Sequence, residues 1–141
     1  MPTSSQPRPV VLRALSLMAE EGDLELIVGS GSSMAPLLCD GDRIQVRRSD
    51  RYRAGDLLVF RNSVDTLVVH RLLGRRWHRG GWHYVLRGDA APAFDGLVDP
   101  GKVLGRVVGG EVNSSAFEIG PEDRLKARWR YLTYWFRRLR R

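Results

Sequence analysis

Hydrophobic and polar positions alternate over most of this chain, as they do in short β-strands. The alternation begins at residues 24–28 (LELIV) and recurs in later runs that are separated by turn-rich pieces. The later runs are RIQVR (43–47), DLLVF (56–60), TLVVHRLL (66–73), WHYVLR (82–87), VLGRVVG (103–109) and SAFEIG (115–120). About seven short strands joined by tight turns predict a mainly antiparallel β domain.

Two stretches outside this β pattern have helical spacing instead. Residues 9–21 place Val11, Leu15 and Met18 on one helical face. The final stretch, 121–141, has an apolar stripe with Arg and Lys around it. The stripe consists of Leu125, Trp129, Leu132, Phe136 and Leu139. The pattern therefore predicts one short N-terminal helix and one amphipathic C-terminal helix beside the β domain.

These patterns divide the 141 residues into three parts. They are an N-terminal tail with a short helix (1–22), a β domain (23–120) and a basic, aromatic C-terminal helix (121–141). A hydrophobic fraction of 43% and a charged fraction of 28% are typical of globular proteins and exclude a chain that is disordered throughout. At this length a single domain can bury an ordinary core.

The formal net charge of +7 is concentrated in the last part of the chain. Residues 121–141 hold eight Lys or Arg against Glu122 and Asp123, a net charge of +6, so the rest of the chain carries +1. A basic helix with Trp129 and Phe136 on one face suits the headgroup layer of an anionic membrane. Two alternatives remain open. The stripe could pack against the β domain, or the tail could bind nucleic acid, which is disfavoured because no recognised binding module is present.

Neither a metal, a cofactor nor an internal disulfide is expected. The single cysteine, Cys39, has no His or Cys partner at metal-ligand spacing, and we expect it to be a small buried apolar residue. No segment approaches the roughly 18 to 20 apolar residues that span a bilayer. Arg13 and then Glu20 and Glu21 interrupt the best candidate for the apolar core of a signal peptide. We therefore expect a cytoplasmic protein, with peripheral membrane contact through its tail.

Residues 29–41 (GSGSSMAPLLCDG) combine flexible and rigid positions around Ser33. A strand would not tolerate the glycines before this serine or Pro36 after it in its middle. A surface linker would not carry Met34 and the two leucines that follow. We interpret the stretch as a stiff elbow that presents one hydroxyl. Serine becomes a nucleophile when a base takes its proton and donors stabilise the oxyanion. Taken alone, an ordinary turn serine is the simpler interpretation.

One histidine and two aspartates could complete a catalytic site with this serine. His70 lies inside the apolar run VVHRL, and imidazole is the side chain best suited to accept a serine proton near neutral pH. Asp89 and Asp95 follow the next strand in RGDAAPAFD. A carboxylate beside the imidazole would fix its tautomer and stabilise the imidazolium. Either aspartate could reach the histidine, and each of the three residues taken alone is more simply structural.

Taken together and in order, these motifs resemble one superfamily. The series is SSMAP (32–36), DGDRIQV (40–46), RAGDLLVF (53–60), VVHRLLG (68–74), LRGDA (86–90) and VLGRVV (103–108). It is similar to the motif series of signal peptidase I and LexA-like serine peptidases over about residues 24–109. The resemblance implies a compact antiparallel β-barrel or sandwich. It also implies a serine endopeptidase that cleaves a leader, signal or precursor peptide.

The resemblance further implies roles for individual residues. Bacterial signal peptidases and LexA-type proteins carry a lysine as general base where this chain has His70, which resembles the archaeal and endoplasmic-reticulum branch. By this comparison Ser33 is the nucleophile, His70 the base, Asp95 the orienting acid and Asp89 a supporting acid. The oxyanion and substrate contacts would come from Gly31, Ser32, Met34 and Pro36.

Two departures from the family pattern leave other functions open. No membrane helix precedes the serine motif, and the position that often carries an oxyanion hydroxyl is Gly31, so Ser32 or backbone N–H groups would serve. One alternative is a LexA-like self-cleaving regulator that binds DNA. About 23 residues before the first strand are too few for a helix-turn-helix domain, and the one Ala-Gly bond, Ala54–Gly55, lies inside a strand-entry motif. The other alternative is a catalytically inactive peptide-binding module, which the retention of all four candidate catalytic residues disfavours.

Overall fold

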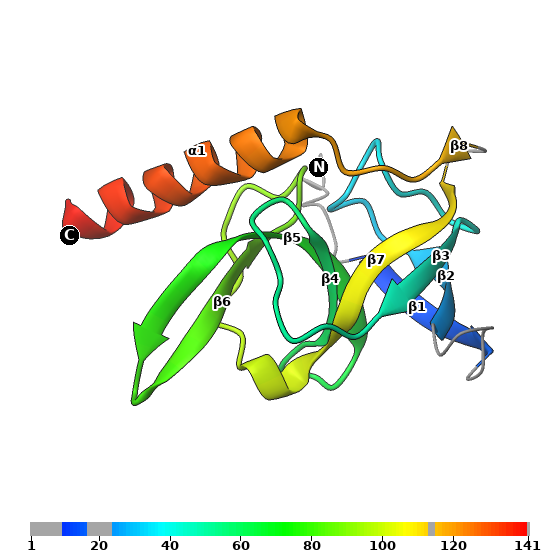
Figure 1. Ribbon diagram of the computed structural model, residues 1–141, viewed down its shortest axis with the longest axis horizontal. Helices are drawn as coiled ribbons and strands as arrows, with labels where there is room; N and C mark the ends of the chain where they lie inside the picture. The colour runs from blue at the N-terminus through cyan, green and yellow to red at the C-terminus, as the bar shows by residue number, and fades with distance from the viewer. Residues whose placement is uncertain (1–9, 17–23, 113–114, 141) are drawn as a thin grey trace, which may run out of the picture.

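A computed structural model of the chain describes residues 10–16, 24–112 and 115–140. These residues form a mainly β structure with one C-terminal α-helix, which confirms the predicted fold class (Figure 1). The strands are β1 (Val10–Ser16), β2 (Leu24–Ser30), β3 (Arg43–Arg47), β4 (Leu57–Arg61), β5 (Leu67–His78), β6 (Gly81–Arg87), β7 (Val103–Val112) and β8 (Ser115–Ala116). A short 3-10 turn, η2 (Pro100–Lys102), precedes β7, and the helix is α1 (Pro121–Leu139).

Strand β1 closes the sheet into a ring. The pairings among the described strands are antiparallel, in the order β1-β2-β3-β7-β4-β5-β6. Strand β1 also pairs with β5, with Val10 opposite Val69 and Val11 opposite Val68. A paired strand on both sides therefore flanks each of β1, β2, β3, β7, β4 and β5. Strand β6 continues from β5 as a hairpin that projects to the lower left in Figure 1.

The N-terminal helix predicted for residues 9–21 is wrong over Val10–Ser16, which form β1; residues 9 and 17–23 lie outside the described residues. The apolar spacing permitted a helix, but two adjacent β-branched residues, Val10 and Val11, favour a strand. Partners on both edges, β2 and β5, supply the ladder hydrogen bonds. Tertiary pairing outweighed a weak local helix signal.

Strand β4 is buried on both of its faces. Side chains alternate along a strand, so Leu57 and Val59 join one apolar cluster, while Leu58 and Phe60 join another. The first cluster also holds Met34 of the elbow, and the second holds residues of β6. The uninterrupted apolar run in the sequence is therefore explained by two separate layers of core around one central strand.

Helix α1 packs beside β5 through one face. Ala127 is fully buried in a cluster with Leu73 and Val85. The ring of Tyr131 occupies the space of a side chain at Gly74, where a Cβ would come within 2.6 Å of the ring. Among the described residues, no helix combines the length and the apolar character that crossing a bilayer would require.

Cys39 is exposed, so the expectation of a buried apolar residue is wrong. It lies in the turn that leads out of the elbow, where its backbone N–H donates to Asp42 Oδ2 at 2.8 Å. The turn places this short segment at the surface, and its apolar neighbours Met34 and Leu38 fill the core in its place.

Gly110 of β7 offers a test of how β7 pairs with β3 in the closed sheet. Its φ of +124° lies in the region that favours glycine, and a Cβ there would overlap the carbonyl oxygen of Arg43 on β3. We expect Gly110→Ala to lower the free energy of unfolding by about 2 kcal/mol or more. Gly96→Ala is the matched control, since nothing lies within 4 Å of its added Cβ. Urea unfolding of both variants is the measurement, and equal midpoints would contradict the assigned β3–β7 register.

Candidate active site

The elbow after β2 holds Ser33 in a fixed position. Gly31 has a φ of +117°, a conformation that glycine adopts without the steric cost of a Cβ. The Leu38 N–H donates to the Met34 carbonyl at 3.1 Å, which closes a turn behind the serine. Both of these side chains are buried in the core cluster. The Met34 side chain thus anchors the elbow by packing in the core, and the oxyanion or substrate role expected for this residue stays a prediction.

Three side chains from separate elements form one hydrogen-bonded line. Ser33 Oγ lies 2.8 Å from His70 Nε2, and His70 Nδ1 lies 2.6 Å from Asp95 Oδ2. A carboxylate only accepts, so the imidazole proton sits on Nδ1 and the Nε2 lone pair faces the hydroxyl. The serine is 1% exposed and the histidine 3% exposed, so their contact is shielded from water, while the Asp95 side chain is 28% exposed. This arrangement can move a proton from the hydroxyl to the imidazole.

The scaffold positions each member of the line independently. His70 stands opposite Leu58 of β4, and its ring contacts Phe60 at 5.9 Å between centroids. The backbone N–H of Asp95 donates to the Leu86 carbonyl at 2.9 Å, which ties the acid's loop to the end of β6. Burial in paired strands and a tied loop limits the rotation of both side chains.

The loop after β6 also contacts the elbow directly. The Ala90 N–H donates to the Ser33 carbonyl at 2.7 Å. A Cβ at Gly88 would lie 2.7 Å from that same carbonyl oxygen and 2.8 Å from the serine Cβ, so only glycine fits. The Asp89 N–H points to the Met34 sulfur at 3.3 Å. The glycine and aspartate of the LRGDA motif thus lie against the elbow at Ser33 and Met34.

Asp89 does not join the imidazole but pairs with a buried arginine. Arg71 Nε and Nη2 each donate to one carboxylate oxygen at 2.8 Å, and Nη1 donates to the Gly55 carbonyl at 2.8 Å. Arg130 of α1 donates to the Asp89 carbonyl at 3.0 Å. The structure therefore separates the two candidate acids: Asp95 contacts the histidine, and Asp89 ties β5, its own loop and α1 together.

Two residues of this site were missed by sequence reasoning. Arg71 follows the histidine directly, but its bidentate pairing depends on a loop 18 positions later. Val10 donates its N–H to Ser33 Oγ at 3.2 Å, from a strand that was predicted to be a helix. No local pattern marks such a contact, since it depends on β1 pairing with β5.

The remaining predicted contact residues lie at the surface of the elbow. Ser32 is exposed, and Pro36 lines a cavity of about 250 Å³ between the elbow and α1. Lys126 and Arg130 line the same cavity from the helix. Within the described ranges, no group of three or more His, Cys, Asp or Glu side chains is arranged to hold a metal ion.

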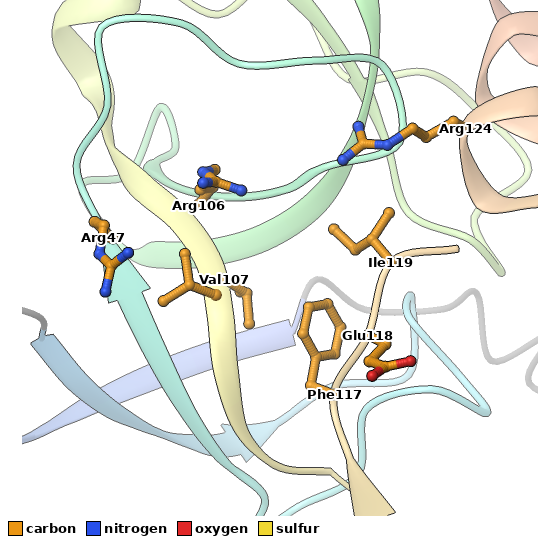
Figure 2. A pocket seen from close by; sticks show the side chains of 8 residues that line it. Arg47, Arg106, Val107, Phe117, Glu118, Ile119 and Arg124 are labelled. Atoms are coloured by element: carbon orange, nitrogen blue, oxygen red, sulfur yellow. The ribbon is translucent and has the colours of Figure 1, made fainter. Parts of the chain in front are cut away.

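A different pocket, of about 410 Å³, lies between β7 and the segment that precedes α1 (Figure 2). Arg47, Arg106 and Arg124 line it together with Phe117 and Glu118. It shares no residue with the Ser33 line and takes no part in the chemistry argued below.

Comparison with known proteins finds two relatives and a matching family model. The LexA repressors of Leuconostoc citreum (strain KM20) and Leuconostoc mesenteroides subsp. mesenteroides are each 28% identical over 95 residues, 67% of this chain. The aligned part covers only 43% and 42% of those proteins, so the chain spans less than half the length of these curated relatives. No solved structure matches significantly. The family model described as Peptidase S24-like matches residues 7–79, which include Ser33 and His70 and make up more than half of the sequence. The chain therefore belongs to the Peptidase S24-like family.

Proposed function

We propose that the chain is a serine endopeptidase that cleaves a leader, signal or precursor peptide. Ser33 is the nucleophile, His70 the general base and Asp95 the acid that orients the base. The observation that carries the proposal is the continuous hydrogen-bonded line of 2.8 Å and 2.6 Å through these three side chains. Membership of a peptidase family supports it. The histidine in place of lysine supports a place in the Ser-His branch, and the cytoplasmic location expected from the sequence stays a prediction.

The acylation step uses the proton positions that the line dictates. Ser33 Oγ attacks the scissile carbonyl carbon while His70 Nε2 takes the hydroxyl proton, and the Asp95 carboxylate stabilises the resulting imidazolium. The imidazolium then gives its proton to the leaving amine nitrogen as the C–N bond breaks. An ester on Ser33 and a free amine remain.

Deacylation repeats the same transfers with water. His70 takes a proton from water, whose oxygen attacks the ester carbon, and then returns that proton to Ser33 Oγ as the acid product leaves. The developing oxyanion needs donors, and Gly31 offers no hydroxyl. Backbone N–H groups of the elbow, or the exposed hydroxyl of Ser32, would serve.

A substrate must gain access to a nucleophile that is nearly fully buried. The Val10 N–H donates to Ser33 Oγ, and β1 is joined to β5 through Val10–Val69 and Val11–Val68. An extended peptide that took the place of Val10 beside β5 would bring its carbonyl group to the serine. This entry route favours substrates that bind as a strand.

Self-cleavage is the second candidate function. The names of the relatives and the chain's own strand against the nucleophile favour it. The Ala54–Gly55 bond is a poor target, however, because its flanking groups are held in place. The Gly55 N–H donates to Leu72 at 2.8 Å, the Gly55 carbonyl accepts from Arg71, and the Ala54 carbonyl accepts from Arg124 at 3.1 Å. Intact-mass measurements on wild type and Ser33→Ala after long incubation decide between self-cleavage and cleavage of other peptides.

Replacing the nucleophile or the base should abolish cleavage. We expect Ser33→Ala and His70→Ala each to lower the rate by several orders of magnitude without unfolding the domain. The assay follows products from a diverse set of synthetic peptides by mass spectrometry. Ser63→Ala, which alters an exposed serine, is the control. Near wild-type turnover by Ser33→Ala would end the serine-peptidase proposal. Peptide binding without turnover by wild type would favour the inactive module.

Acid should inhibit the reaction. A protonated imidazole cannot accept the Ser33 proton, so the rate should fall once the pH is low enough to protonate the base. The measurement is a pH–rate profile, corrected for any loss of folded protein. His78→Gln and His83→Gln should leave the profile unchanged, because neither ring is in the line. A profile that stays flat down to about pH 5 would exclude His70 as the base.

Substitution of Asp95 should lower the rate, whereas substitution of Asp89 should lower the stability. Asp95→Asn removes the acceptor for His70 Nδ1–H, and we expect kcat to fall roughly a thousandfold or more with stability retained. Asp89→Asn weakens a largely buried ion pair with Arg71, and we expect it to cost about 2 kcal/mol of unfolding free energy. Rates and thermal melts of both variants test the assignment. A stable but inactive Asp89→Asn would show that the roles are reversed.

A further inference from the structure

The face of α1 that points away from the β domain is apolar. Its five large apolar residues are exposed, with exposed fractions of 57% for Leu125, 64% for Trp129, 47% for Leu132, 63% for Phe136 and 79% for Leu139. At 3.6 residues per turn these five side chains fall within an arc of roughly 90°. Ala127, Tyr131 and Tyr134, which contact the domain, lie on the opposite side of the helix. The alternative expectation, that the stripe packs against the β domain, is therefore wrong.

This stripe is unusual for a helix that already has a docked face. A surface helix normally buries its apolar side and turns its polar side to water. Here small and aromatic residues make the domain contact, and five large apolar side chains are left uncovered by the described elements. Figure 1 shows α1 along the outside of the sheet. A contiguous exposed apolar stripe of this kind marks an interaction surface.

Basic side chains border the stripe on both sides. At helical spacing Arg128 lies along one border, and Lys126, Arg137 and Arg140 lie along the other. All four residues are exposed. The segment 121–141 carries a net charge of +6. A partner must therefore offer both an apolar layer and negative charge.

We propose that this stripe docks α1 on the surface of an anionic lipid bilayer, with the helix axis in the plane of the headgroups. Trp129, Phe136 and the leucines would enter the boundary of the acyl chains, while the basic borders meet anionic headgroups. A second copy of the chain would place the same +6 helix against itself, which is repulsive. Nucleic acid would meet the charges but leave the apolar side chains in water.

Docking in this way would bring the candidate active site to the membrane. Ala35 and Pro36 of the elbow share a cavity with Lys126 and Arg130 of α1. The elbow therefore lies beside the helix that contacts lipid. If the proposed peptidase function holds, precursor peptides attached to the bilayer would be its accessible substrates. The lipid contact itself does not rest on that function.

Co-sedimentation of the full chain with vesicles tests the proposal. We expect binding to vesicles with about 30% phosphatidylserine to be at least tenfold tighter than to pure phosphatidylcholine, and to weaken in about 0.5 M salt. Trp129→Gln combined with Phe136→Gln should weaken binding at least tenfold. The matched control is Trp77→Gln with Trp82→Gln, two tryptophans of the β5–β6 hairpin that are 58% and 53% exposed. That control should bind as wild type does.

Point variants replace truncation here because Ala127 is buried and Arg124 pairs with Asp56 at 3.2 Å, so deleting α1 would disturb the domain. Three results would overturn the proposal. The first is no vesicle binding by the folded full chain, and the second is equal loss in the control. The third is a dimer in sedimentation velocity, or a DNA complex in gel shifts, formed without vesicle binding. Cleavage of a soluble peptide, measured in parallel, separates failure of the lipid contact from failure of the peptidase proposal.

Discussion

One backbone contact, between the Ser33 carbonyl and the Ala90 N–H at 2.7 Å, joins the segment that bears Ser33 to the loop that bears Asp95. Ser33 lies in the segment that follows β2, while His70 belongs to β5, and these two strands are not neighbours in the sheet order. Hydrogen bonds of 2.6 to 2.8 Å tolerate displacements of only a few tenths of an ångström. Packing of the elbow in the core and the close contact of Gly88 with the Ser33 backbone hold the three side chains within these distances.

A buried arginine links the loop after β6 to β5 and to α1. Arg71 is 5% exposed, and removing a guanidinium from water is costly unless its donors are satisfied. Asp89 and the Gly55 carbonyl satisfy it, and Asp123 of α1 lies 3.9 Å away. The helix thus belongs to the electrostatic support of the site through one face. Its other face is available for a different partner.

Burial of Ser33 and His70 has two opposing consequences. Exclusion of water strengthens the hydrogen bond between these two side chains. Burial also hides the hydroxyl from a peptide, and the Val10 N–H is in contact with it. Under the proposed function, a peptide would reach the hydroxyl by taking the place of Val10 beside β5.

The sequence by itself determined the features that depend on local pattern. Alternation and turns located the strands, including β3 at residues 43–47, and the motif series marked Ser33 and His70. The residue pattern left open which aspartate reaches the imidazole, and the resemblance favoured Asp95. Only the tertiary structure brings Asp95 to His70 and Asp89 to Arg71, because the two acids share one loop and differ in where it folds back. It also turned Val10–Ser16 into a strand and left the α1 stripe exposed. These outcomes depend on contacts between distant segments, which periodicity along the chain does not encode.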